Sequence, residues 1–307
     1  MPNLRLKDIS ADPILSSVVR GYTAPERLVY SEIFPVIPVD KENGKIRTFG
    51  KEYFRTYNSG RAIHGPSNVG KGLDSSKIPY SLDEREISIP IDYREEAESE
   101  DALKAEYAEL AMRNIQLGLE EEVAATLQNT ATYTSGHTEA LTGADKFSDS
   151  ACKPVTIIND AKSTVASKIG VQPNTLVLSD DSFKALKENP SMIELIKYSQ
   201  KGIVTMDLMK ELFEVENIII ADTIITDTAD NFVNLYNACA MLFYIAPPGQ
   251  RSKRDASFGY TLQLKGFPKG DEWQEAHGKV RYVRATTIQQ QMILMREAAF
   301  LFTNTVS

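Results

Sequence analysis

The chain has 307 residues, of which 42% are hydrophobic and 25% charged, with a formal net charge of −8. Since a typical domain has ~150 residues, one elaborate domain or two lobes are expected. No apolar run approaches the roughly 18 residues that a membrane span needs, and the N-terminus lacks the apolar stretch of a signal peptide. The acidic balance argues against a dedicated nucleic-acid binder, whose contact surface would be basic.

The first forty residues have the character of an arm. Short pieces such as Ile14–Gly21 lie between five prolines: Pro2, Pro13, Pro25, Pro35 and Pro38. Because proline interrupts helices and sheet ladders, we expect this segment to bury little of itself and to need a partner surface.

Residues 44–90 predict a long excursion from the body of the fold. A basic, β-forming stretch covers residues 45–55, and a second extended run covers residues 78–91, where isoleucines alternate with Ser88 and Pro90. The tip between them is rich in glycine, serine and asparagine. A loop of this length inside a compact domain is normally functional or disordered.

The next segment predicts the longest helix, capped by Ser99 and running to about Thr130. Gly118 lies inside it, where glycine costs about 1 kcal/mol relative to alanine, so we interpret Gly118 as a close-packing or bending point beneath the sheet. The apolar residues of two adjoining stripes are expected to form its core face: Leu103, Tyr107, Leu110, Leu117, Met112, Ile115, Leu119, Val123 and Leu127.

The remaining sequence alternates helices and strands and then turns to strands alone. Helices are predicted at 154–169, 181–187, 191–199 and 206–213, with strands at 175–178, 218–225 and 239–245. The tail is predicted as strands at 258–264, 277–285, 288–295 and 298–302. Helices grouped before strands favour an α+β fold over a doubly wound sheet.

Motifs for catalysis are weak. Gly65–Gly72 matches the phosphate-binding loop at both glycines and at Lys71, but Gly72 stands where a magnesium-binding Ser or Thr belongs. The three histidines (His64, His137 and His277) are isolated in sequence and are expected on the surface or in turns. Cys152 and Cys239 lack metal-ligand spacing and are expected to be buried. We therefore predict no enzyme, no cofactor and no metal.

The order of these segments resembles the Hong Kong 97-type fold of tailed-bacteriophage major capsid proteins. Residues 49–55 and 87–92 resemble the ribbons of that family's extended loop, and residues 175–205 resemble its axial domain. Residues 257–261 and 298–304 resemble the strands that re-enter its peripheral domain. The resemblance covers nearly the whole chain, and its specificity comes from the order of diffuse motifs.

The resemblance implies a domain layout. Residues 1–43 would be the N-terminal arm, 44–91 the extended loop, 92–150 the peripheral domain with its spine helix, 151–256 the axial domain, and 257–307 the peripheral-domain strands.

The resemblance also implies a structural subunit that self-assembles through pentamers and hexamers into the icosahedral head enclosing the phage genome, assembled in the host cytoplasm and ending in the virion. Implied partners are copies of itself, a portal, a decoration protein, and packaged DNA through non-specific contact, with no membrane. Because the sequence starts directly with the arm, scaffolding is expected to come from a separate protein or to be unnecessary. The alternatives are a nanocompartment shell with the same fold and, in a different class, a P-loop nucleotide hydrolase.

Charge is distributed unevenly between two of these segments. Residues 41–71 hold seven basic residues against two acidic ones, a net of +5, and residues 92–122 hold eleven acidic residues against three basic ones, a net of −8. In the family the extended loop lies across a neighbour's spine helix, so we expect the two segments to meet between subunits. The proposed contacts are Lys45, Arg47, Lys51, Arg55, Arg61, Glu96, Glu100, Asp101 and Glu109.

Overall fold

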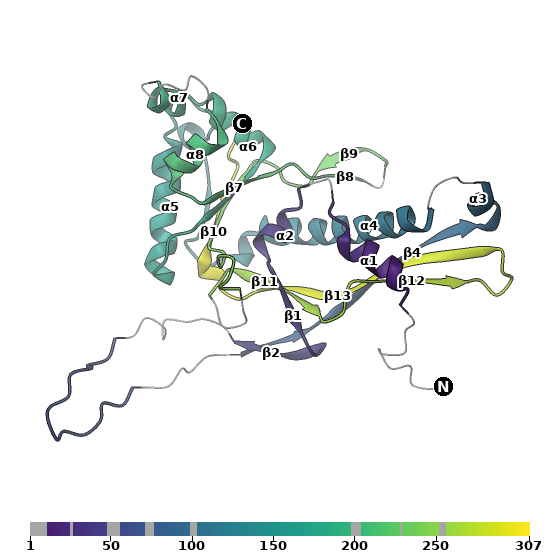
Figure 1. Ribbon diagram of the computed structural model, residues 1–307. Coiled ribbons are helices and arrows are strands. Elements are labelled where there is room, and N and C mark those ends of the chain that lie inside the picture. The colour runs from purple at the N-terminus through teal and green to yellow at the C-terminus, as the bar shows by residue number, and fades with distance from the viewer. Residues whose placement is uncertain are drawn as a thin grey trace.

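The computed structural model describes residues 11–24, 27–47, 56–70, 77–98, 103–197, 204–227, 229–251 and 256–307. In these residues the strands form two five-stranded sheets and two two-stranded hairpins, and the helices include one of 25 residues (Figure 1). The predictions at Lys51, Arg55, Lys71, Gly72, Ser99, Glu100 and Asp101 lie outside the described residues.

The first sheet is built around one long strand, β13 (Val280–Ile293). On one side β13 pairs with β4 (Asp83–Asp92), and on the other it pairs with β12 (Lys269–Gln274) near its start and β11 (Gly259–Leu264) near its end. β1 (Val36–Val39) adds a parallel edge to β11. The sequence predicted two strands where β13 runs unbroken, because the β-branched pair Thr286–Thr287 continues the strand rather than interrupting it. β12 was not predicted.

The long helix α4 (Leu103–Leu127) lies across this sheet and contacts β4 and β13 (Figure 1). A second helix, α3 (Tyr93–Glu98), precedes it. The buried face of α4 contains the second predicted stripe together with three alanines and one carboxylate: Ala108, Ala111, Met112, Ile115, Leu119, Glu120, Val123, Ala124 and Leu127. Leu110 is 40% exposed, contrary to the expectation. A Cβ at Gly118 would meet no atom within 4 Å, so the close-packing interpretation is wrong within the subunit.

The expectation that the N-terminal segment buries little of itself is wrong, because its described residues pack on their own chain. Helix α1 (Pro13–Gly21) contacts β12 and α4, and helix α2 (Val29–Ile33) contacts α4. Buried apolar side chains occur throughout it: Leu15, Val19, Leu28, Val29, Tyr30, Ile33, Phe34, Ile37 and Val39. The prolines do not prevent this burial, since Pro13 stands at the start of α1 and Pro38 in an edge strand, where each is tolerated.

The second sheet has the order β5 (Thr138–Ala140), β14 (Ala299–Thr303), β10 (Cys239–Phe243), β6 (Thr175–Ser179) and β7 (Asn217–Ala221). The helices of this lobe are α5 (Pro154–Ile169), α6 (Asp180–Glu188), α7 (Pro190–Ile196) and α8 (Met206–Phe213). Short 3-10 turns occupy Thr130–Thr132, Gly143–Asp145 and Arg296–Ala298. The closing strand was expected with the other tail strands, but β14 pairs with β10 and so fastens the chain end to this second sheet.

Two two-stranded hairpins are paired into neither five-stranded sheet. β2 (Asn43–Arg47) pairs with β3 (Lys77–Ser81), and β8 (Ile224–Thr226) pairs with β9 (Phe232–Asn234). The sequence predicted one strand over residues 218–225, where the structure has β7 and β8 separated by a break at Asp222–Thr223. Figure 1 shows the two hairpins on different sides of the molecule, with residues 56–70 lying away from both sheets and β8–β9 reaching over α4.

Candidate assembly surfaces

The base of the predicted excursion is a true hairpin. Ile46 is 2% exposed and pairs with Ile78, whereas the neighbouring Lys45 faces solvent. Gly44 faces Tyr80 across the hairpin, and a Cβ at Gly44 would lie 2.6 Å from the Tyr80 hydroxyl oxygen. Glycine is therefore needed for this ring to lie against the backbone.

The proposed basic contacts on this excursion are exposed as far as their side chains are described. Lys45 and Arg61 are both exposed, and Arg61 lies in the outlying segment 56–70. For Arg47 only the backbone is described, while Lys51 and Arg55 lie outside the described residues. Of the five proposed basic contacts, the side chains of Lys45 and Arg61 are thus the ones described.

The acidic segment is less available than its net charge implies. Glu106, Glu109 and Glu121 are exposed on α4. In contrast, Glu122 accepts two hydrogen bonds from Arg85 of β4, at 2.6 and 2.7 Å, and Glu95 accepts one from the Tyr107 hydroxyl at 2.6 Å. Two carboxylates of the acidic run are therefore already paired within the subunit.

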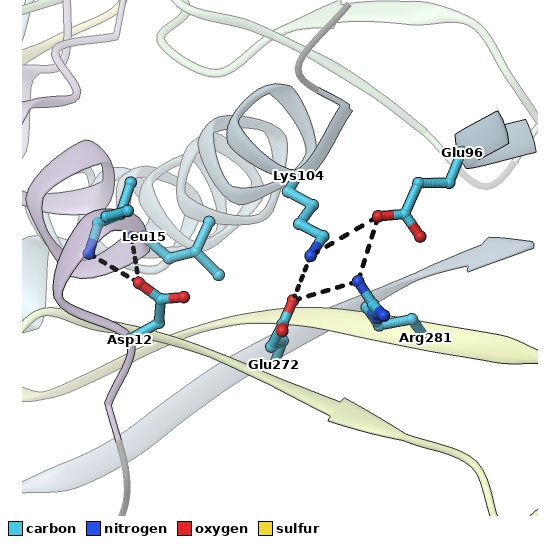
Figure 2. A network of polar contacts seen from close by, with 7 residues as sticks. Asp12, Leu15, Glu96, Lys104, Glu272 and Arg281 are labelled. Carbon is cyan, nitrogen blue, oxygen red and sulfur yellow. Dashed lines mark hydrogen bonds and ion pairs between the residues drawn. The ribbon is translucent and has the colours of Figure 1, made fainter. Parts of the chain in front are cut away.

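Glu96, one of the predicted contact residues, belongs to a network within the subunit (Figure 2). Its carboxylate lies 3.1 Å from Arg281 of β13 and 3.6 Å from Lys104 of α4. Glu272 of β12 faces the same two cations, at 3.0 Å from Lys104 and 3.9 Å from Arg281. These four side chains are 31–36% exposed, so the network joins α3 and α4 to the far end of the sheet while remaining in contact with solvent.

Sequence reasoning missed a buried carboxylate, Glu120. It is 0% exposed and accepts hydrogen bonds from the backbone N–H of Val29 at 3.1 Å, the N–H of Tyr30 at 2.9 Å and the Tyr236 hydroxyl at 2.7 Å. Burial raises the pKa of Glu120, and these hydrogen bonds oppose the rise. The one sequence signal was its position: Glu120 follows Leu119 on the buried face of α4 rather than continuing the solvent face.

The residues considered for chemistry lie apart. His64 and His277 are exposed as predicted, but His137 is 0% exposed, and its Nδ1 lies 2.9 Å from the carbonyl oxygen of Ala299. Both cysteines are buried and free. Within the described residues, no three His, Cys, Asp or Glu side chains gather as a metal site, and no helix is long and apolar enough to span a membrane.

The phosphate-loop match has no supporting architecture in the part that is described. Residues 56–70 contain no strand or helix, and the chain is next described in β3, which begins at Lys77. Arg61 and Ile63, where a phosphate loop requires a buried strand, are exposed.

The comparisons with known proteins identify the family. A family model described as phage major capsid protein E matches residues 100–244, from the α3–α4 junction through β10. The major capsid protein of Burkholderia phage BcepMu is 41% identical over 293 residues, which are 94% of this chain and 95% of that protein. The chain belongs to the phage major capsid protein family.

This capsid protein also resembles solved structures over nearly its full length. A phage-related protein from Bordetella bronchiseptica RB50 is 28% identical with a TM-score of 0.79, covering 96% of this chain and 97% of that one. The capsid of cyanophage P-SCSP1u, 11% identical, gives a TM-score of 0.59 over 92% of this chain and 89% of that one, which concerns the fold alone. The predicted Hong Kong 97-like α+β fold is confirmed.

The family also decides the class of function. The capsid protein is a shell-forming structural subunit of the virion and not an enzyme. Its relatives support the phage head over the nanocompartment shell and the P-loop hydrolase, the two alternatives that the sequence left open.

Proposed function

We propose that copies of this capsid protein assemble through pentamers and hexamers into the icosahedral head that encloses the phage genome. Residues 1–43, 44–91, 92–150, 151–256 and 257–307 would serve as arm, extended loop, spine-bearing peripheral domain, axial domain and returning strands, with β14 completing the axial sheet. A portal, a separate scaffolding protein and a decoration protein complete the proposed partners, with assembly in the host cytoplasm.

The observation that carries this proposal is a pair of oppositely charged surfaces that do not meet in one subunit. Exposed Lys45 and Arg61 lie on the excursion, and exposed Glu106 and Glu109 lie on α4. Figure 1 places the excursion and α4 on different sides of the first sheet. A second copy is therefore needed to bring the two together.

The proposed contact is collective. An exposed ion pair contributes only about 0.2–1 kcal/mol, so no single pair decides assembly. Repeated at each contact of a shell, complementary potentials set the register of association more than its strength. Because the protein has a net charge of −8, packaged DNA would touch the inner surface of the shell through non-specific contacts alone.

Charge reversal tests the proposal. Changing Lys45 and Arg61 to Glu should slow shell formation at low salt, and changing Glu106 and Glu109 to Lys in the same chain should restore much of the rate. Glu96 is left intact, because Lys104 and Arg281 engage it within the subunit. Because screening shortens such interactions to about 10 Å at 0.1 M salt, the defect should shrink as salt rises.

The matched control reverses two exposed lysines on the other lobe, Lys168 and Lys187, which applies the same change in net charge. Light scattering reports the rate, and electron microscopy reports closed shells. Assembly at the wild-type rate by the Lys45 and Arg61 variant at low salt would refute the charge contact, and wild-type protein that never closes shells would refute the head proposal itself.

A further inference from the structure

The β8–β9 hairpin is firmly held at its base. Thr223, 2% exposed, donates its hydroxyl to the carbonyl oxygen of Arg27 at 3.1 Å, and its own carbonyl accepts the N–H of Leu235 at 3.1 Å. The side-chain amide of Gln128, at the end of α4, donates to the Leu235 carbonyl at 2.9 Å. These contacts fix where the hairpin leaves the second lobe.

The turn of the hairpin is also fixed. The Asp227 carboxylate accepts the N–H groups of Ala229 at 2.8 Å and Asn231 at 2.9 Å, and these hydrogen bonds lower the pKa of Asp227. The hairpin is therefore a shaped projection.

The strands between base and turn carry apolar side chains that their own subunit leaves uncovered. Phe232 is 83% exposed, Ile224 49% and Val233 41%. β8 and β9 pair with each other and join neither five-stranded sheet. Two-stranded ribbons of this kind are marginally stable in water and gain stability when a further surface covers them.

A second set of exposed apolar side chains lies elsewhere on the same chain. In the described residues, the two large apolar side chains more exposed than Phe232 are Val69 at 90% and Ile63 at 89%, both in segment 56–70. That segment contains Arg61 and no acidic residue, whereas residues 221–234 contain three aspartates and no lysine or arginine. The two projections thus share exposed apolar side chains and differ in the sign of their charge.

The β8–β9 hairpin and segment 56–70 cannot contact each other within one subunit, because they project from different sides of the molecule (Figure 1). Two different patches that meet between copies form a head-to-tail contact, which generates closed rings when the rotation closes. A shell-forming subunit requires such contacts, and burying exposed apolar side chains drives association independently of salt.

We propose that the β8–β9 hairpin of one copy packs against segment 56–70 of an adjacent copy, with Phe232 placed between Ile63 and Val69. Arg61 would face the aspartates of the hairpin. This inference rests on the proposed function, in which the excursion reaches over the neighbour's α4, and adds an apolar contact where that proposal supplies only charge.

The first experiment measures assembly of Phe232→Ser against the matched control Val171→Ser, which removes a 40% exposed aliphatic side chain at the far end of α5. Phe232→Ser should raise the subunit concentration needed for shells about tenfold, as expected for a buried aromatic anchor. The shift should persist at high salt, unlike that of the charge reversal. Val171→Ser should assemble at the wild-type concentration.

The second experiment identifies the partner surface by disulfide formation. The double variant Ile63→Cys with Phe232→Cys should form covalent chains of subunits under oxidising conditions once shells assemble, while each single variant should not. The background is low because Cys152 and Cys239 are buried, and burial raises their thiol pKa values to about 11 and about 12.

The outcomes separate this inference from the proposed function. If Phe232→Ser forms shells at the wild-type concentration, or if the double-cysteine variant forms shells without cross-links, the hairpin contact is wrong while the head proposal stands. If Phe232→Ser loses its fold by circular dichroism, the double-cysteine cross-link alone decides, since it is read on shells that have formed.

Discussion

Residues 12–39 and residues 56–70 are both interrupted by residues that break helices, yet the first segment lies in the core of its own subunit and the second lies exposed. The first carries nine buried apolar side chains, whereas the second presents Ile63 and Val69 almost fully to solvent. The number and spacing of apolar residues, rather than the number of prolines, therefore decide whether a segment packs against its own subunit.

Local geometry makes the burial of the first segment possible. Asp12 caps α1 by accepting the N–H of Ile14 at 2.7 Å and of Leu15 at 3.2 Å, so Pro13 begins a helix instead of ending one (Figure 2). Leu15 then packs beside Gly270 of β12, where an added Cβ would lie 2.9 Å from the Leu15 Cβ. Pro13 at the start of α1 and Pro38 in the edge strand β1 thus occupy positions that tolerate a missing backbone donor.

Deleting residues 1–30 should have the largest effect on the stability of the subunit. The deletion removes Leu15, Val19, Leu28, Val29 and Tyr30 from the core. Full burial of such side chains contributes about 1.5–3 kcal/mol each, a sum comparable with the 5–15 kcal/mol total stability of a typical domain. We expect no cooperative unfolding transition by circular dichroism. Deleting residues 1–10 alone retains every described contact and should leave the transition in place; a folded 1–30 deletion would mean that the segment behaves as a detachable arm.

Replacing Glu120 should have the next largest effect, because this carboxylate fastens α2 to α4. Glu120→Ala leaves the N–H groups of Val29 and Tyr30 and the Tyr236 hydroxyl without their acceptor. Leaving a buried donor unpaired costs about 1–3 kcal/mol, so a total loss on the order of 3 kcal/mol is expected in urea unfolding. The exposed Glu121→Ala serves as control and should change stability by less than about 0.5 kcal/mol. Equal effects of the two substitutions would show that the Glu120 carboxylate does not stabilise the contact between α2 and α4.

The same residue predicts a pH dependence. Burial raises the pKa of Glu120 in the folded chain above its ordinary value, so the folded state holds the proton more tightly than the unfolded state. The resulting stabilisation is complete below the ordinary carboxyl pKa of about 4.3 and is lost as pH rises through the higher folded pKa. Glu120→Gln cannot titrate at this position. The unfolding free energy of wild type should therefore fall relative to that of Glu120→Gln as pH rises; a rise instead would contradict the raised pKa.

The sequence predicted more of the fold than of the surfaces that assemble it. Helices 154–169 and 206–213 were predicted at the bounds that the structure has, because Gly170 and Thr205 mark their ends clearly. The pairing of β14 with β10 could not be predicted, since strand partners far apart in sequence leave no local signal. The acidic run 92–122 was interpreted as one surface, but only tertiary structure separates buried Glu120 and paired Glu96 from exposed Glu109.

Gly118→Ala should stabilise α4, the helix against which the N-terminal segment packs. A Cβ at Gly118 has open space around it, and glycine inside a helix is about 0.8–1 kcal/mol less favourable than alanine. The subunit should therefore gain up to about 1 kcal/mol in urea unfolding. Gly118→Leu should also fold, and a failure of that variant to form shells would indicate close approach of a second copy at this point. A destabilised Gly118→Ala would restore the close-packing interpretation.

The smallest effect on subunit stability is expected from substitutions in residues 56–70. Ile63 and Val69 are 89% and 90% exposed, so replacing both with Ser removes almost no buried apolar area. Surface substitutions of this kind change stability by less than about 0.5 kcal/mol, and the urea midpoint should stay at the wild-type value. Because the same side chains are proposed to be covered by Phe232 of an adjacent copy, shell formation should weaken while the isolated subunit remains unchanged. Measured together, the two quantities distinguish a segment that serves its own fold from one that serves a neighbour: a loss of subunit stability would place residues 56–70 in the same class as residues 12–39, and the contrast between them would disappear.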